Sequence, residues 1–124
     1  MARHNQTGNW GENVAVEFLV KKGYDILERN WRLGKMEIDI IAKDQQRVIF
    51  VEVKTRSNDE YIDYLETITR QKTTFMRRCS TAYMEQYPEN FTCQFDYIFI
   101  VGKPDNYIVE HYPDAFFPPM KTYR

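Results

Sequence analysis

Two carboxylates and one lysine occur inside stretches of sequence that are otherwise apolar and β-branched. Asp39 lies in the segment MEIDIIA, and Glu52 and Lys54 lie in the segment RVIFVEVK. An unpaired charge is expensive to bury, so charges beside buried strands need partners. If the two segments pair, the three side chains converge on one point and form a candidate metal site with an adjacent cation.

The chemistry that this trio supports is phosphodiester hydrolysis. Carboxylate oxygens are hard ligands that suit Mg²⁺ or Mn²⁺, and such an ion polarises a phosphate and lowers the pKa of a bound water. Lys54 would stabilise developing negative charge or orient the attacking water. Because a divalent ion removes the repulsion between Asp39 and Glu52, we expect it to raise the melting temperature. The competing interpretation is an exposed ion pair at a sheet edge, where charge discourages aggregation.

A third carboxylate, Glu12, precedes Ala15 by three residues and Leu19 by seven. This spacing places Glu12 on the inward face of a helix, near its N-terminal end. Two interpretations remain open. Glu12 is either a third acid of the site or the partner of Asn9 in a capping pair, in which its side chain reaches back to the Asn9 amide.

Hydrophobic periodicity and turn residues predict two helices and five strands. Gly23 is a natural end for the first helix, and Gly34 marks a turn between strands. The predicted elements are a helix at 10–22, strands at 24–31, 36–42 and 47–55, a helix at 69–86, and strands at 95–101 and 107–112, with a polar loop at 56–66. This order predicts a single α/β domain over residues 1–124, with helices flanking a mixed sheet.

Alternation along the strands decides which side chains meet. In the second strand, Glu37, Asp39 and Ile41 are expected on one face; in the third, Glu52 and Lys54 share a face. A hairpin between these strands places Asp39 near Glu52 and Lys54. The opposite face of the third strand carries Ile49, Val51 and Val53, which are expected to pack under a helix.

Composition describes a soluble globular protein and excludes several classes. Of 124 residues, 43% are hydrophobic and 28% charged, which excludes a disordered chain. No apolar run approaches the ~20 residues that span a bilayer, and no signal peptide is recognisable, so the cytoplasm is the expected location. Cys79 and Cys93 lack metal-type spacing and are expected to be reduced, with Cys79 in the core. Asp96 is expected to be structural, holding a backbone amide or an arginine.

The net charge of −1 is not that of a strongly basic nucleic-acid-binding protein. Basic residues are nevertheless unevenly distributed, and the candidate phosphate contacts are Arg56, Lys72, Arg77 and Arg78. Arg56 follows Lys54 closely and would lie at the mouth of the proposed site. For the residues of the second helix, the competing interpretation is an ordinary solvated helix face.

Several spaced motifs together resemble one known family over nearly the whole chain. The sequence resembles the YraN family, also called UPF0102, and the most specific block is FVEVKTR at 50–56. The other matching segments are Gly11-Glu12 with Ala15, Leu19 and Gly23-Tyr24, then Asn30-Trp31-Arg32, EIDIIA at 37–42, Lys72, Phe95-Asp96 and Asp114-Ala115-Phe116. Met36 departs from the pattern, because the family usually has glycine directly before the Glu-Ile-Asp segment.

The resemblance implies a restriction-endonuclease-like fold of the PD-(D/E)XK type and a distant relationship to archaeal Holliday junction resolvases. Residue by residue, Glu12 matches the helix acid and Asp39 the strand acid. Glu52 and Lys54 match the Glu-x-Lys pair, and Lys72 matches a lysine at the start of the second helix. The resemblance therefore favours Glu12 as a site residue, although it could also act as a cap.

Two functions follow. The first is a Mg²⁺- or Mn²⁺-dependent endonuclease acting on DNA, with branched or damaged DNA as candidate substrates. Asp39, Glu52 and Glu12 would bind the metal. Branched DNA would favour a symmetric homodimer, for which the aromatic segment 116–119 is a candidate surface. The alternative is a non-catalytic nucleic-acid-binding module of the same fold, which acts through a partner in DNA maintenance. No membrane partner is expected.

Overall fold

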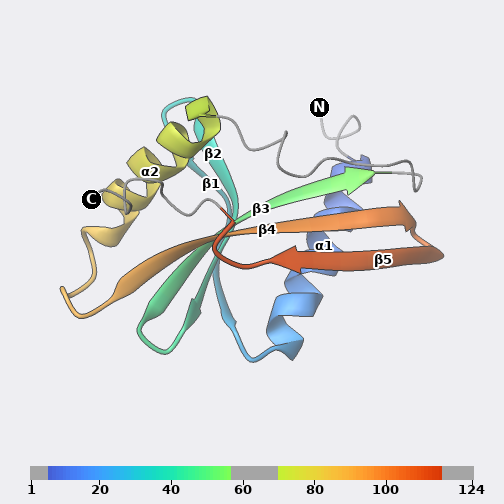
Figure 1. The fold of residues 1–124 in the computed structure, drawn as a ribbon, viewed down its shortest axis with the longest axis horizontal. Coiled ribbons are helices and arrows are strands. Elements are labelled where there is room, and N and C mark those ends of the chain that lie inside the picture. The colour runs from blue at the N-terminus through green and yellow to red at the C-terminus, as the bar shows by residue number, and fades with distance from the viewer. Residues whose placement is uncertain (1–5, 57–69, 116–124) are drawn as a thin grey trace.

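The computed structural model describes residues 6–56 and 70–115, which form a mixed sheet covered by two helices (Figure 1). The sheet has the strand order β1-β2-β3-β4-β5. The helices are α1 (Gln6–Lys21) and α2 (Arg70–Met84), and the strands are β1 (Asp25–Leu33), β2 (Met36–Asp44), β3 (Arg47–Arg56), β4 (Thr92–Lys103) and β5 (Asn106–Tyr112). The α/β class and the element order predicted from the sequence are confirmed, with strand ends displaced by at most three residues.

The connections explain why the sheet is mixed. Strands β1, β2 and β3 are antiparallel neighbours, and the turns between them contain Gly34 and Gln45 with positive φ angles of 63° and 61°. Strand β4 pairs parallel with β3, which requires a crossover, and α2 lies within that crossover. Strand β5 then returns antiparallel to β4. Arg56 is the last residue of β3 instead of the start of a loop, and residues 57–66 of the predicted loop lie outside the described residues.

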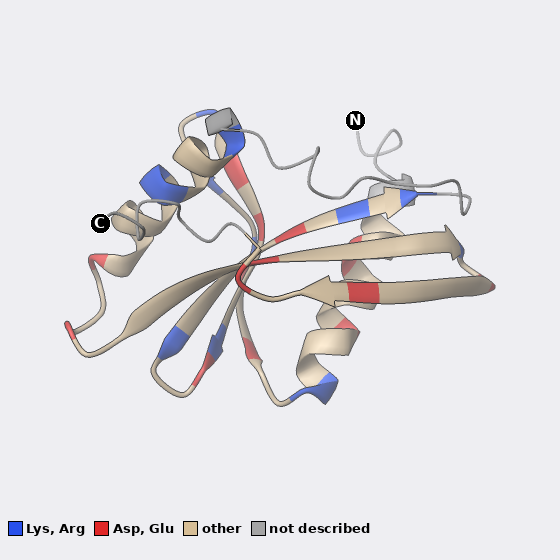
Figure 2. Cartoon of the chain, in the orientation of Figure 1, with Lys and Arg blue, Asp and Glu red and all other residues tan. Residues whose placement is uncertain are grey.

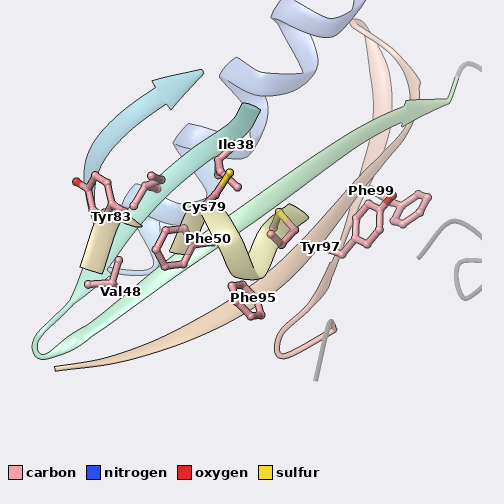
Figure 3. Packing of buried hydrophobic residues seen from close by; sticks show 10 residues of the cluster. Ile38, Val48, Phe50, Cys79, Tyr83, Phe95, Tyr97 and Phe99 are labelled. Carbon is pink, nitrogen blue, oxygen red and sulfur yellow. The ribbon is translucent and has the colours of Figure 1, made fainter. Parts of the chain in front are cut away.

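Each face of the sheet carries its own apolar cluster. The cluster under α1 consists of Ala15, Leu19, Ile40, Ile49, Val51, Ile98 and Ile100. The cluster under α2 includes Cys79 and Tyr83 beside Val48, Phe50 and Phe95 of the sheet (Figure 3). Residues that alternate along β3 and β4 enter opposite clusters, as period-2 geometry requires. The predictions that Val51 packs under a helix and that Cys79 is a core residue are confirmed.

Helix α1 begins about one turn earlier than the sequence predicts. Because the helix starts at Gln6, Asn9 lies within it and is not the N-cap residue. The interpretation of Glu12 as the capping partner of Asn9 is therefore wrong. A cap signal is local, and an asparagine that could begin a helix can also lie within a longer one. Among the described residues, neither helix is long and apolar enough to cross a membrane.

Alternation is interrupted in β1 and β2 at the same level of the sheet. Ile38 and Ile41 both join the cluster under α2, whereas Ile40 joins the cluster under α1. The expectation that β2 alternates regularly through Asp39 is therefore incorrect. The register places Asn30 across from Asp39, between the pairs Arg29–Ile40 and Trp31–Ile38, and Asn30 has a left-handed backbone with φ of 54°. Both strands thus twist sharply where the candidate site lies.

A buried aspartate fastens the end of the described chain to the sheet. Asp96 Oδ1 accepts hydrogen bonds from the Asp114 amide at 3.1 Å and from Gln94 Nε2 at 2.8 Å. Its Oδ2 lies 2.7 Å from His111 Nε2, and the Asp96 side chain is fully buried. The expectation that Asp96 is structural and holds a backbone amide is confirmed.

Candidate functional site

The four residues predicted to act together line one hollow of about 350 Å³. Glu12 comes from α1, Asp39 from β2, and Glu52 and Lys54 from β3. Val53, Thr55 and Arg56 complete the described lining. Figure 2 shows the same order of charge along β3, where an acidic band is followed by basic bands toward the end of the strand. The structure thus brings together side chains separated by up to about forty positions in the sequence.

Asp39 lies where β2 and β3 separate. The ladder between the strands ends at the pair Ile40–Val51, and beyond it Asp39 Oδ2 accepts a hydrogen bond from the Val53 amide at 2.8 Å. Burial and the neighbouring Glu52 carboxylate raise the pKa of Asp39 from 3.8 to about 7, although the Val53 amide opposes the rise. Glu12 adds to it. The carboxyl group is therefore out of water and next to another acid, and both conditions disfavour its charged form.

Glu52 is buried and bound to a lysine of α2. Lys72 Nζ donates a hydrogen bond to Glu52 Oε2 at 2.6 Å, and the two side chains are 29% and 10% exposed. Burial lowers the pKa of Lys72, but attraction to the Glu52 carboxylate outweighs burial, so the pKa of Lys72 is raised. We predicted Lys72 as a phosphate contact; in this structure its ammonium group is bound to an acid of the site.

Lys54 is one of two cationic residues in the described lining of the hollow, with Arg56. Its side chain is partly buried and lines the hollow beside Asp39 and Glu52, and it makes no ion pair with a residue in the described part of the chain. Arg56 also lines the hollow, and its Nη1 donates a hydrogen bond to the Thr55 carbonyl at 3.0 Å. Lys54 and Arg56 therefore lie where an anionic ligand of the hollow would meet them.

Glu12 is held at the edge of the hollow by residues of β1. Its side chain is 14% exposed, and Arg29 Nη2 lies 3.6 Å from Glu12 Oε1. The Asn30 amide fits between two carboxylates when its nitrogen faces them, 3.1 Å from Glu12 Oε2 and 2.9 Å from Glu37 Oε2. Burial raises the pKa of Glu12, and the contacts with Asn30 and Arg29 partly offset this rise.

Three contributors to this geometry were not recognised from the sequence. Arg29 and Asn30 contact Glu12, and Asn30 lies within a matching family segment without having been assigned a role. Gly11 allows α1 to approach β3 closely, because a Cβ atom there would lie 2.3 Å from Thr55 Oγ1. Gly11 could have been recognised by its position directly before Glu12. Asn30 could have been recognised because asparagine tolerates a left-handed backbone conformation.

The remaining predicted basic residues lie elsewhere. Arg77 and Arg78 line a different hollow along α2, of about 370 Å³, with Thr74, Thr81, Ala82 and Glu85. Neither contributes to the lining of the hollow that contains Lys54.

The donor atoms of the hollow fit a hard divalent cation. Asp39, Glu52 and Glu12 offer only carboxylate oxygens, the ligand type that such a cation prefers. In the described ranges, no three Asp, Glu, His or Cys side chains are already gathered closely enough to hold an ion. An ion held by all three acids at once would therefore require them to draw together, whereas an ion held by one or two of them would keep water ligands.

The fold and the hollow define an α/β protein in which carboxylates and a lysine meet where two central strands separate. The chain belongs to the family described as Uncharacterised protein family UPF0102, which it matches over residues 11–100. This confirms the resemblance seen in the sequence.

Relatives match over almost their whole length. A UPF0102 protein of Bacteroides thetaiotaomicron is 39% identical over 120 residues, which cover 97% of this chain and 99% of the relative. A UPF0102 protein of Flavobacterium psychrophilum is 38% identical and covers 94% and 98% of the two chains. One of Chlorobium phaeobacteroides is 42% identical and covers 88% and 92%.

Proposed function

We propose that the protein is a metal-dependent endonuclease that hydrolyses DNA phosphodiester bonds, with branched or damaged DNA as the candidate substrate. The observation that carries the proposal is the convergence of Glu12, Asp39, Glu52 and Lys54 on one hollow. The α-β-β-β-α-β order and the separation of the central strands at Asp39 support a PD-(D/E)XK fold. Mg²⁺ or Mn²⁺ is the proposed cofactor.

Each residue has a distinct part in this proposal. Asp39 and Glu52 would hold the metal, with Glu12 at the edge of the hollow. The bound ion would supply Lewis acidity and a more acidic water. Lys54 stabilises the negative charge that develops on the phosphate, and Arg56 binds a phosphate oxygen. Lys72 fixes one oxygen of Glu52 and so orients the carboxylate toward the hollow.

A second candidate is a non-catalytic DNA-binding module that acts through a partner. The ion pair between Lys72 and Glu52 favours it, because one acid is already neutralised without a metal. The net charge of −1 also provides little attraction for duplex DNA over the whole surface.

The test is cleavage of end-labelled linear, flapped and four-way-junction DNA with Mg²⁺ or Mn²⁺. Wild type is compared with Lys54→Ala and Glu52→Gln, and Lys103→Ala is the matched control because Lys103 is an exposed lysine at the end of β4. An endonuclease cleaves at least one substrate, and cleavage is lost in Lys54→Ala and Glu52→Gln but kept in the control. Cleavage that persists in both site variants refutes the assigned site.

Binding separates the two candidates. A nuclease that carries Lys54→Ala should keep most of its DNA affinity, measured by fluorescence anisotropy, while it loses cleavage. Specific DNA binding by wild type with no metal-dependent cleavage of any substrate would instead support the binding module. Millimolar Mg²⁺ or Mn²⁺ should also raise the melting temperature of wild type more than that of Glu52→Gln.

A further inference from the structure

The acids of the candidate site also border a second, smaller hollow. Asp39 and Glu52 line both hollows, and the second measures about 180 Å³. Its apolar part is formed by Met36 of β2 and by Phe75, Met76 and Cys79 of α2. Ile38, Glu37 and Lys72 complete its lining, so the smaller hollow joins a charged side to an apolar side. The first hollow has no aromatic or sulfur-containing side chain in its described lining, and the two hollows meet at the same pair of acids.

The walls of the smaller hollow suit a flat, uncharged ring. Met76 and Cys79 are 2% and 1% exposed and form a buried floor, and burial raises the pKa of the Cys79 thiol so that the floor stays neutral. Phe75 is 39% exposed, which leaves an aromatic side chain in water beside charged groups. Lys72 also lines the hollow, where its ammonium group is bound to Glu52.

We propose that the smaller hollow binds an unpaired nucleobase of the nucleotide beside the phosphate held in the larger hollow. The inference rests on the proposed binding of DNA at this site and names its substrate class. DNA with an unpaired nucleotide at the site of action, such as a flap or a branch point, is bound in preference to continuous duplex. A base within a duplex has its faces stacked and its pairing edge occupied, so it cannot enter.

Three observations select a base over other occupants. The volume lies below the ~300–1,000 Å³ typical of pockets for drug-sized ligands, so it admits one ring system but not a whole nucleotide. The apolar wall of Met36, Phe75 and Met76 disfavours a second phosphate. An accessible aromatic ring is the usual platform on which single-stranded nucleic acids stack their bases.

The experiment measures affinity by fluorescence anisotropy without divalent metal, so that no cleavage occurs. Three DNAs of one sequence are compared: continuous duplex, duplex with a single-stranded flap, and the same flap with abasic nucleotides placed in turn near the junction. Wild type should bind the intact flap about tenfold more tightly than the flap with the critical nucleotide abasic, which corresponds to ~1.4 kcal/mol. Phe75→Leu keeps an apolar side chain without an aromatic face, and it should lose that difference. Phe75→Trp should retain it.

The abasic DNA provides the decisive control. If Phe75 acts through the base, Phe75→Leu weakens binding to the intact flap but leaves binding to the abasic flap unchanged. Equal affinity of wild type for intact and abasic flaps at every position overturns the inference. The inference is also overturned if Phe75→Leu loses the same amount of affinity for all three DNAs. If the protein binds the base in this assay but cleaves none of the same DNAs once Mg²⁺ or Mn²⁺ is added, the nuclease is refuted and the base site stands. If it cleaves intact and abasic flaps equally with metal and binds them equally without it, the nuclease stands and the base site is refuted.

Discussion

Replacing Asp39 with asparagine should stabilise the protein at pH 8, although it removes a proposed metal ligand. Asp39 is held among other acids, and burial together with the neighbouring Glu52 carboxylate raises its pKa from 3.8 to about 7. Asparagine carries no charge and retains an oxygen that can accept the hydrogen bond from the Val53 amide. Its amide hydrogens could also be donated to neighbouring carboxylates. Residues that are suited to function often reduce stability in this way.

The magnitude and its pH dependence follow from linkage. Between pH 3.8 and about 7 the folded protein keeps a proton on Asp39 that the unfolded chain has lost, so stability falls as the pH rises through this window and levels off above it. Each pKa unit corresponds to ~1.4 kcal/mol, which sets an upper limit of about 4 kcal/mol at pH 8. Because an asparagine side chain must also be buried and so keeps a desolvation cost of its own, the substitution should recover about half of this limit, or ~2 kcal/mol.

Urea unfolding of wild type and Asp39→Asn between pH 4 and pH 8 measures this difference. The two proteins should have similar free energies of unfolding near pH 4, and Asp39→Asn should gain an advantage as the pH rises. At pH 8 its melting temperature should be roughly 8 °C higher. The control is Asp105→Asn, the same chemical change at an exposed turn. Equal stability of Asp39→Asn and wild type at pH 8, or a difference that does not depend on pH, would refute the electrostatic reasoning.

Three further substitutions test the contacts around the site by urea unfolding. Gly11→Ala should destabilise the protein by ~1 kcal/mol because the added Cβ would meet Thr55 Oγ1. The same change in a Thr55→Ala background should be neutral or stabilising. A loss of equal size in both backgrounds contradicts the close approach of α1 to β3. Asn30→Ala should cost ~1 kcal/mol more than Asn30→Gly, since only glycine adopts a φ of 54° without strain, and equal costs would contradict this. Lys72→Met should lower the free energy of unfolding by ~2 kcal/mol, because it leaves Glu52 buried without its cation. Adding Glu52→Gln should restore most of that free energy. If it does not, Lys72 stabilises the protein by packing instead of by its charge.

The convergence of the acidic residues could be predicted because it depends on local rules. The apolar segments that contain Asp39 and Glu52 are long enough to be central strands, and the short turn at Gln45 forces them to pair antiparallel. Helical spacing then placed Glu12 on the face that covers the sheet. These constraints are short in range, so the residues alone predicted that Asp39 and Glu52 meet. The resemblance to the family was needed to favour Glu12 as a site residue over a capping partner.

Features that depend on two neighbouring strands at once could not be predicted from the sequence. The left-handed Asn30 and the interrupted alternation at Ile38 occur at the same level of β1 and β2, and neither pattern is visible in one strand alone. The pairing of Lys72 with Glu52 depends on how α2 lies across the sheet, which helical periodicity does not specify. The start of α1 was misjudged for a related reason, because Asn9 carries a genuine cap signal that the longer helix overrides.

The parallel pairing of β3 with β4 has a consequence for the order in which the chain acquires structure during synthesis. Helix α1 and strands β1 to β3 are complete before α2 and β4 have been made, and antiparallel neighbours can pair as soon as both exist. Phe50 and Ile38 must then remain uncovered until the chain returns through α2 to place β4 beside β3. Non-local parallel pairing is slow, and exposed apolar surface favours association with other chains. The interval before β4 docks is therefore when the nascent protein is most open to aggregation or to capture by a chaperone.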